Sequence, residues 1–114
     1  MPKRPPSVEP APAAERPWHI RPASARAEKE WQRAVTADPE LMATVRERLR
    51  LRPLDRSDNP NRTHQLKGPL AEKWIGDVKL PQWQHEITGA GRVFSCPDRD
   101  NRVVWVTRVD LAHP

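Results

Sequence analysis

The tripeptide Asp38-Pro39-Glu40 constrains the fold more than any other feature of this sequence. Proline is tolerated in the first turn of a helix but not in its interior, and an aspartate just before it can accept hydrogen bonds from free backbone N–H groups. One helix must therefore end before this tripeptide, and another must begin at it. Apolar residues at helical spacing predict these helices over residues 24–36 and 38–52. Because the connection is so short, we expect an antiparallel helical hairpin.

After a polar loop at residues 53–62, the chain changes to short extended runs. The predicted strands cover residues 63–67, 72–75, 78–80, 82–88, 92–96 and 102–109, and a brief extended segment is expected at residues 16–21. The last strand is rich in β-branched residues, which favours a buried central position. Two helices followed by about four antiparallel strands predict an α+β domain, in which the helical hairpin packs on one face of the sheet.

Proline crowds the start of the chain. Residues 1–17 contain six prolines and no apolar run, so we expect a disordered tail at residues 1–16 and one small domain at residues 17–114. The tail lacks the apolar segment of a signal peptide, and no run elsewhere approaches the roughly 18 apolar residues of a membrane span. Cys96 is the only cysteine, which excludes an intramolecular disulfide and favours a reducing, cytoplasmic location.

The chain is basic, with a formal net charge of +5. This balance favours polyanionic partners, namely nucleic acid, the ribosome or an acidic protein. The four histidines and the single cysteine do not have the spacing of a metal site, so we expect neither a metal nor another cofactor. Of the five tryptophans, only Trp18 and Trp74 lie outside the predicted apolar faces and are candidates for contact with nucleic-acid bases.

The stretch Gly89-Ala90-Gly91 lies between two predicted strands. Glycine permits positive φ and so closes tight turns, whereas a phosphate-binding glycine loop leads into a helix. We therefore interpret this stretch as a turn. Strand alternation places the following Arg92 on the same side as Phe94 and Cys96. If that side were the core, Arg92 would have to lie at the mouth of the strand.

Four motifs follow one another in the second half of the chain. They are His-Gln-Leu-Lys-Gly at residues 64–68, Trp-Gln-His-Glu-Ile-Thr-Gly-Ala-Gly-Arg-Val-Phe at 83–94, Val-Val-Trp-Val-Thr at 103–107 and His-Pro at 113–114. With the two helices, this order resembles the RelE/ParE toxin superfamily over residues 24–114, and most closely its RelE/YoeB-like bacterial variant that ends in His-Pro-Lys. The resemblance implies a RelE-like fold and a type II toxin held inactive by a cognate antitoxin.

The superfamily contains more than one activity, so the resemblance leaves alternatives open. RelE- and YoeB-type members are endoribonucleases that cleave mRNA, usually on the ribosome, and inhibit translation. ParE-type members inhibit DNA gyrase without cutting RNA. The sequence departs from the nuclease pattern in having no tyrosine and in lacking a lysine after Pro114. A gyrase inhibitor, a catalytically decayed binding protein and nonspecific nucleic-acid binding through the basic tail therefore remain as alternatives.

The resemblance also implies a set of catalytic residues: His64, Lys67, Arg92, Arg108 and His113. Arg92 falls where ribonuclease members hold the scissile phosphate, and Lys67 and Arg108 match other basic positions. His64 stands at the position of a proposed general base. His113 lies close to a C-terminal catalytic position, although Asp110 matches that position better.

Metal-independent RNA cleavage requires residues of these types. The 2′-hydroxyl attacks its own phosphate, so one group must accept a proton, another must protonate the leaving 5′-oxygen, and cations must stabilise the phosphate charge. An unperturbed histidine titrates near ~6.5, which suits a base at position 64 and an acid at position 113. Each of these residues also has a plain interpretation as solvated surface, and His85 is expected at the edge of the core. The nuclease hypothesis requires the predicted residues to converge on one surface of the sheet.

Overall fold

The structure, a computed structural model, describes residues 16–54, 63–87 and 91–111. The predicted tail up to residue 15, most of the polar loop, the first part of the glycine turn and His113 lie outside these described residues. The elements are, in chain order, β1 (His19–Pro22), α1 (Ala25–Ala37), α2 (Pro39–Leu51), β2 (Thr63–Gln65), the 3-10 helix η3 (Gly68–Leu70), β3 (Glu72–Ile75), β4 (Val78–Pro81), β5 (Trp83–Glu86), β6 (Arg92–Asp98) and β7 (Val103–Asp110).

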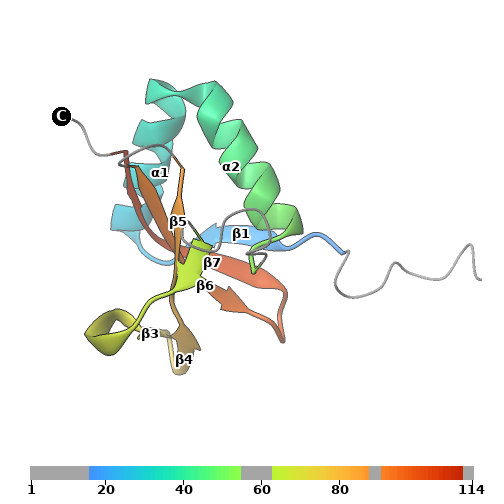
Figure 1. The fold of residues 1–114 in the computed structure, drawn as a ribbon, viewed down its shortest axis with the longest axis vertical. Helices are drawn as coiled ribbons and strands as arrows, with labels where there is room; N and C mark the ends of the chain where they lie inside the picture. Colours follow the sequence, from blue (N-terminus) through green and yellow to red (C-terminus); the bar gives the residue numbers. More distant parts are fainter. Residues whose placement is uncertain (1–15, 55–62, 88–90, 112–114) are drawn as a thin grey trace, which may run out of the picture.

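Both helices begin at the capping residues that the sequence predicts. Ser24 Oγ accepts a hydrogen bond from the backbone N–H of Ala27 at 3.1 Å, and Asp38 Oδ1 accepts one from Leu41 at 3.1 Å. Each cap satisfies a backbone donor that the first turn of a helix leaves unpaired. Pro39 is the first residue of α2. The predicted helical hairpin is confirmed, and α1 and α2 lie next to each other on one side of the sheet (Figure 1).

The main sheet has five strands in the order β1-β7-β6-β5-β2. The pairs among β2, β5, β6 and β7 are antiparallel, as predicted. The sequence predicts about four strands, and β1, which pairs with β7 in parallel, is the fifth strand of the sheet. Two backbone hydrogen bonds hold the start of β1 in place. The N–H of Trp18 donates to the carbonyl oxygen of Arg50 at 2.7 Å, and the N–H of His19 donates to that of Arg102 at 2.9 Å. The α+β class is confirmed, and β1 is an edge strand of the sheet that contacts both helices.

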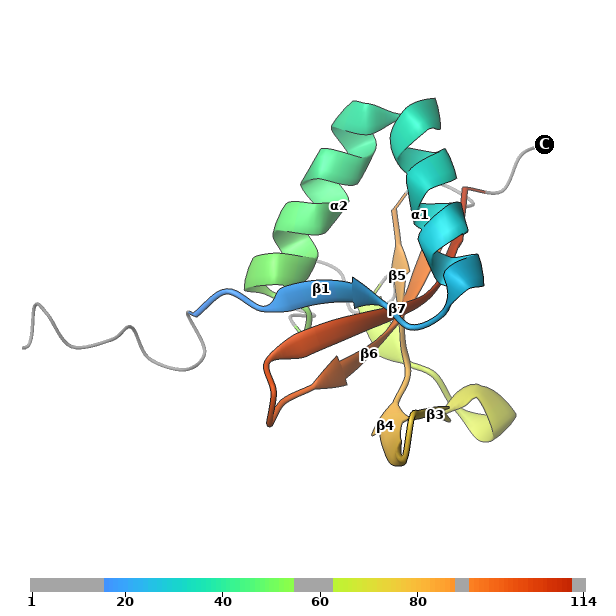
Figure 2. The same ribbon diagram turned by 180° about the vertical axis from the view of Figure 1, so that it is seen from behind.

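Strands β3 and β4 form a separate two-stranded hairpin. Gly76 occupies the first central position of its turn with φ +62°, a conformation that glycine adopts without strain. Both views show this hairpin at the end of the domain away from the helices (Figures 1 and 2). Trp74 on β3 is 64% exposed, so it is accessible for contacts, as the sequence predicts.

The core lies between the two helices and one face of the main sheet. Its buried residues are Trp18, Ala34, Met42, Val45, Leu49, Val93, Val104, Val106 and Val109. Trp18 is only 6% exposed, so the prediction that it is a candidate contact residue is wrong. The guanidinium of Arg102 lies over the Trp18 ring, 4.6 Å from its centre. No helix in the described ranges is long and apolar enough to cross a membrane.

Candidate functional site

One row of directly paired residues crosses four strands of the main sheet. His64 pairs with Gln84, Gln84 with Phe94, and Phe94 with Arg108. Directly opposite residues in antiparallel strands place their side chains on the same face. Val93, the neighbour of Phe94, is fully buried in the core. Because neighbouring residues point to opposite faces, the row lies on the face turned away from the helices.

A second row lies beside the first on the same face. Glu86 pairs with Arg92, and Arg92 with Asp110. The seven residues of the two rows define what we call the open face: His64, Gln84, Glu86, Arg92, Phe94, Arg108 and Asp110. The side chain of Arg92 is 40% exposed and that of Arg108 is 49% exposed. A ligand from solvent can therefore reach both guanidinium groups.

A β-bulge in β7 places Arg108 on the open face. Phe94 pairs with Arg108, but the next residue of β6, Ser95, pairs with Val106. Thr107 is therefore an extra residue on β7. Without it, Arg108 would share the core face with Val106, because strand side chains alternate with a period of two.

The bulge is anchored by a buried chain of hydrogen bonds. Thr107 Oγ1 donates to Oε1 of Gln82 at 2.6 Å, and Nε2 of Gln82 donates to the backbone oxygen of Leu70 at 3.0 Å. Both Thr107 and Gln82 are buried, where an unpaired polar group would be costly. The bulge is thus tied to the segment that leads into the β3–β4 hairpin.

Arg92 and Arg108 are diagonal neighbours on β6 and β7, since Arg92 pairs with Asp110. Diagonal neighbours lie about 7–8 Å apart, so two arginine side chains can reach one small ligand. Arg92 Nη2 lies 3.8 Å from Glu86 Oε1, and Arg108 Nε lies 3.9 Å from Glu30 Oε2. Ion pairs of this length between partly exposed groups contribute little to stability. A phosphate can therefore compete with Glu86 for Arg92, and it can approach the Nη groups of Arg108 beside the Nε contact with Glu30.

The other predicted site residues lie apart from this arginine pair. His64 is half-buried at the opposite end of the row from Arg108, three strand spacings or about 14 Å away. Lys67 is exposed between β2 and η3 and belongs to neither row. His113 lies outside the described residues. The fold thus brings His64, Arg92 and Arg108 onto one face and leaves Lys67 beyond the end of β2.

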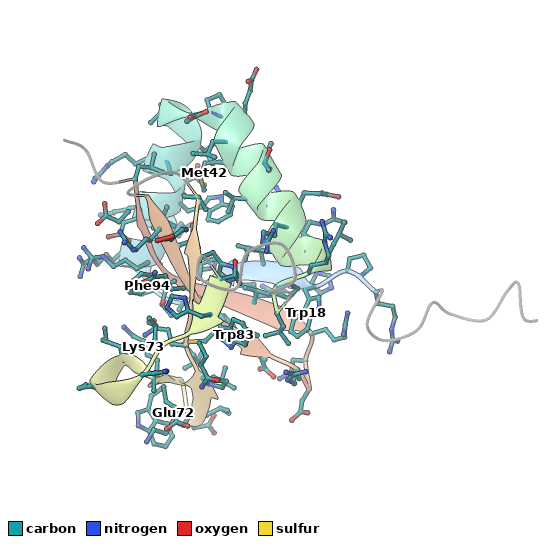
Figure 3. The ribbon with its side chains drawn as sticks, viewed as in Figure 1. Trp18, Met42, Glu72, Lys73, Trp83 and Phe94 are labelled. Carbon is teal, nitrogen blue, oxygen red and sulfur yellow. The ribbon has the colours of Figure 1, made fainter. Side chains whose placement is uncertain are left out.

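Strand alternation correctly placed Arg92 on the side of Phe94 and Cys96, and that side is not the core. Cys96 is nevertheless fully buried, and burial raises the pKa of its thiol to about 11, against a smaller opposing effect of Lys73 on β3. The hairpin therefore approaches this part of the sheet. In the view of Figure 3, Phe94 and Lys73 lie below the core residue Met42, toward the hairpin. The prediction that Cys96 is a buried small residue is confirmed, and its thiol is protonated at neutral pH.

His85 lies on the core side of β5, as predicted. Its side chain is 1% exposed, its Nε2 lies 3.3 Å from Ser95 Oγ, and its Nδ1 has no hydrogen-bond partner in the described part of the chain. Burial, and then the charges of Arg48 and His64, lower the pKa of His85 from 6.5 to about 4. The ring is therefore neutral at physiological pH. Among the described residues, no group of three His, Cys, Asp or Glu side chains could hold a metal ion.

Three residues of or beside the open face were missed by the sequence reasoning: Gln84, Phe94 and Glu30. Phe94 is the only phenylalanine, and the alternation that placed Arg92 also placed Phe94 beside it. Which side of β6 faces the helices could not be decided without the sheet order. No pattern in the sequence connects Glu30, in the middle of α1, with the end of β7.

The chain is similar to a solved structure. No protein-family model matches the chain, and no curated protein matches it. Among solved structures, the chain is similar to the toxin–antitoxin complex RelBE2 from Mycobacterium tuberculosis, with 19% sequence identity and a TM-score of 0.49. The similarity covers 84% of this chain and 99% of that chain. This similarity is too low to indicate an activity, so the proposed function rests on the residues of the open face.

Proposed function

We propose that this protein is the toxin of a type II toxin–antitoxin pair and that it cleaves mRNA at its open face. The observation that carries the proposal is the pair of exposed guanidinium groups on Arg92 and Arg108, with Phe94 next to both on the same face. Guanidinium groups bind phosphate through paired N–H donors, and an aromatic ring stacks on a base. Together they offer an RNA strand one backbone contact and one base contact.

In the proposed reaction, the RNA supplies its own nucleophile. The 2′-oxygen forms a bond to the adjacent phosphorus, the bond to the 5′-oxygen breaks, and the products carry a 2′,3′-cyclic phosphate and a free 5′-hydroxyl. Arg92 and Arg108 stabilise the additional negative charge on the phosphate oxygens in the transition state. Two guanidinium groups can perform this role without a metal ion.

Proton transfer completes the proposed site. His64, at the far end of the row, is the general base that accepts the proton of the 2′-hydroxyl. It lies about 14 Å from Arg108, so the RNA must lie across β5 and β6. The side chains of His64 and Arg108 then reach the attacked linkage from opposite ends of the row. Lys67 contacts the backbone beyond His64. His113 returns a proton to the 5′-oxygen.

The proposed partners follow from charge and from the reaction. A net charge of +5 favours association with the ribosome and its message. A cognate antitoxin keeps the toxin inactive by covering the open face.

The proposal is tested with the purified full chain, translating ribosomes and a defined message. We expect new 5′ ends within the message, mapped by primer extension, and unchanged supercoiling by DNA gyrase. Blocked supercoiling with intact message would show that the ParE-like alternative is correct. A chain without residues 1–16 separates specific cleavage from binding through the basic tail. If the proposal is correct, the shortened chain cuts at the same positions.

A further inference from the structure

Glu30 connects the helical hairpin with the end of the open face. It lies in the middle of α1, and its side chain is only 16% exposed. Oε1 accepts a hydrogen bond from the backbone N–H of Val109 at 2.9 Å. Oε2 lies 3.2 Å from Nε of Arg26 and 3.9 Å from Nε of Arg108. One carboxylate thus contacts a strand backbone and two guanidinium groups.

The position of Glu30 follows from the topology of the sheet edge. The parallel pairing of β1 with β7 ends where Pro22 meets Val106, so β7 continues beyond its edge partner. Backbone groups at such an edge need other hydrogen-bond partners. Helix α1 runs along this part of β7, where the buried Ala34 permits close approach, and Glu30 supplies an acceptor.

The two oxygens of Glu30 have different roles. Oε1 is engaged by an uncharged backbone donor, which leaves Oε2 as the contact for the arginines. Arg26 is 70% exposed on the outer side of α1, whereas Arg108 belongs to the open face. The contact with Arg108 is made through Nε, one of the five N–H donors of a guanidinium group. The other four donors belong to the two Nη groups, which can bind a phosphate in a bidentate manner.

We infer that Glu30 is the positioning residue of the phosphate site: it holds Arg108 by its Nε edge and thereby presents the Nη groups to the RNA phosphate. The inference rests on the proposed function for its catalytic consequence. The contact between Glu30 and Arg108 does not depend on that function. A preorganised cation requires less rearrangement in the transition state than a mobile one.

If Glu30 acted only through its hydrogen bond with the Val109 N–H, its charge would not affect Arg108. Glu30→Gln separates the two roles, because glutamine keeps an oxygen acceptor for the Val109 N–H and removes the charge that attracts Arg108. Arg26→Gln is the matched control, since it removes the other guanidinium neighbour of the same oxygen. Both variants are made in the full chain.

The first measurement is NMR of the arginine Nε–H groups and of backbone hydrogen exchange. In Glu30→Gln, we expect the Arg108 Nε signal to shift and to report faster motion, while the Val109 amide keeps its protection. Arg26→Gln should leave the Arg108 signal in place. If the Arg108 signal is the same in the parent and in Glu30→Gln, the inference is wrong. Loss of protection at Val109 without any change at Arg108 would also contradict it.

The second measurement is a double-mutant cycle on RNA cleavage. Glu30→Gln should lower kcat about tenfold to a hundredfold with KM within about twofold of the parent, as for a misplaced catalytic group. In an Arg108→Ala background, the same change should have no further effect, because Glu30 acts through Arg108. An equal loss in both backgrounds would overturn the inference. If the parent cuts no RNA, the proposed function fails, and the NMR result still decides whether Glu30 positions Arg108.

Discussion

The two faces of the main sheet are built from the same strands but serve different purposes. On β6, the fully buried Val93 lies between Arg92 and Phe94, whose side chains point to the other face. The helix side gathers apolar residues from both helices and excludes water. The open face alternates two guanidinium groups with carboxylates, a histidine and one aromatic ring. The difference predicts that stability and the proposed function can be altered separately, residue by residue along one strand.

The largest expected effect is a loss of stability on substitution of a core residue, which distinguishes the core face from the open face. Leu49→Ala removes a buried side chain from α2, and we expect it to lower the free energy of unfolding by about 2–5 kcal/mol. Urea unfolding followed by circular dichroism measures the change. At temperatures where the variant stays folded, RNA cleavage should be unchanged. A folded Leu49→Ala protein with greatly reduced cleavage would show that the two faces are not independent.

The next effect concerns the pH dependence of stability. The pKa of His85 is about 4 in the folded chain and near 6.5 in the unfolded chain, so between these values the unfolded chain binds more protons. The contribution of neutral His85 to the free energy of unfolding is therefore fully present above about pH 6.5, and about 3 kcal/mol of it is lost as the pH drops toward 4.

Unfolding curves at several pH values test this contribution. His85→Gln should flatten the profile between pH 6.5 and 5, whereas substitution of the exposed His19 on β1, His19→Gln, should leave it as steep as in the parent. If the two variants behave alike, the buried histidine is not the cause of the pH dependence.

A smaller effect is expected at the bulge that turns Arg108 outward. Thr107→Val removes the hydroxyl donor and leaves Gln82 Oε1 unpaired in a buried position, which should destabilise the chain by about 1–3 kcal/mol. Ser95→Ala removes a buried hydroxyl on the core side of β6 and serves as the control. Since the bulge sets the side of Arg108, Thr107→Val should also reduce cleavage, and Ser95→Ala should not. Equal cleavage by the two variants would show that the bulge does not affect the activity of the open face.

Local signals predicted much of the fold. The Ser24 and Asp38 caps, the proline at the start of α2 and the alternation along β5 and β6 depend on neighbouring residues, and these features were predicted correctly. The parallel pairing of β1 could not be predicted, because it depends on contacts with Arg50 and Arg102 far along the chain.

The site was less predictable than the fold. The side of Arg92 followed from alternation, but its exposure depends on which face the helices cover. The side of Arg108 depends on one extra residue in β7, and a plain period of two would have placed it in the core. Lys67 was grouped with the arginines by resemblance, whereas in the fold it lies beyond the end of β2.

The most direct test of the open face compares two arginine variants in the same cleavage assay. Arg92→Ala removes a guanidinium from the open face, and Arg46→Ala removes one from the exposed side of α2. We expect Arg92→Ala to lower kcat about 10²–10³-fold, equivalent to about 2.7–4 kcal/mol of transition-state stabilisation, while Arg46→Ala cleaves like the parent. If the two variants cleave ribosome-bound message at the same rate, the phosphate is not held at the open face.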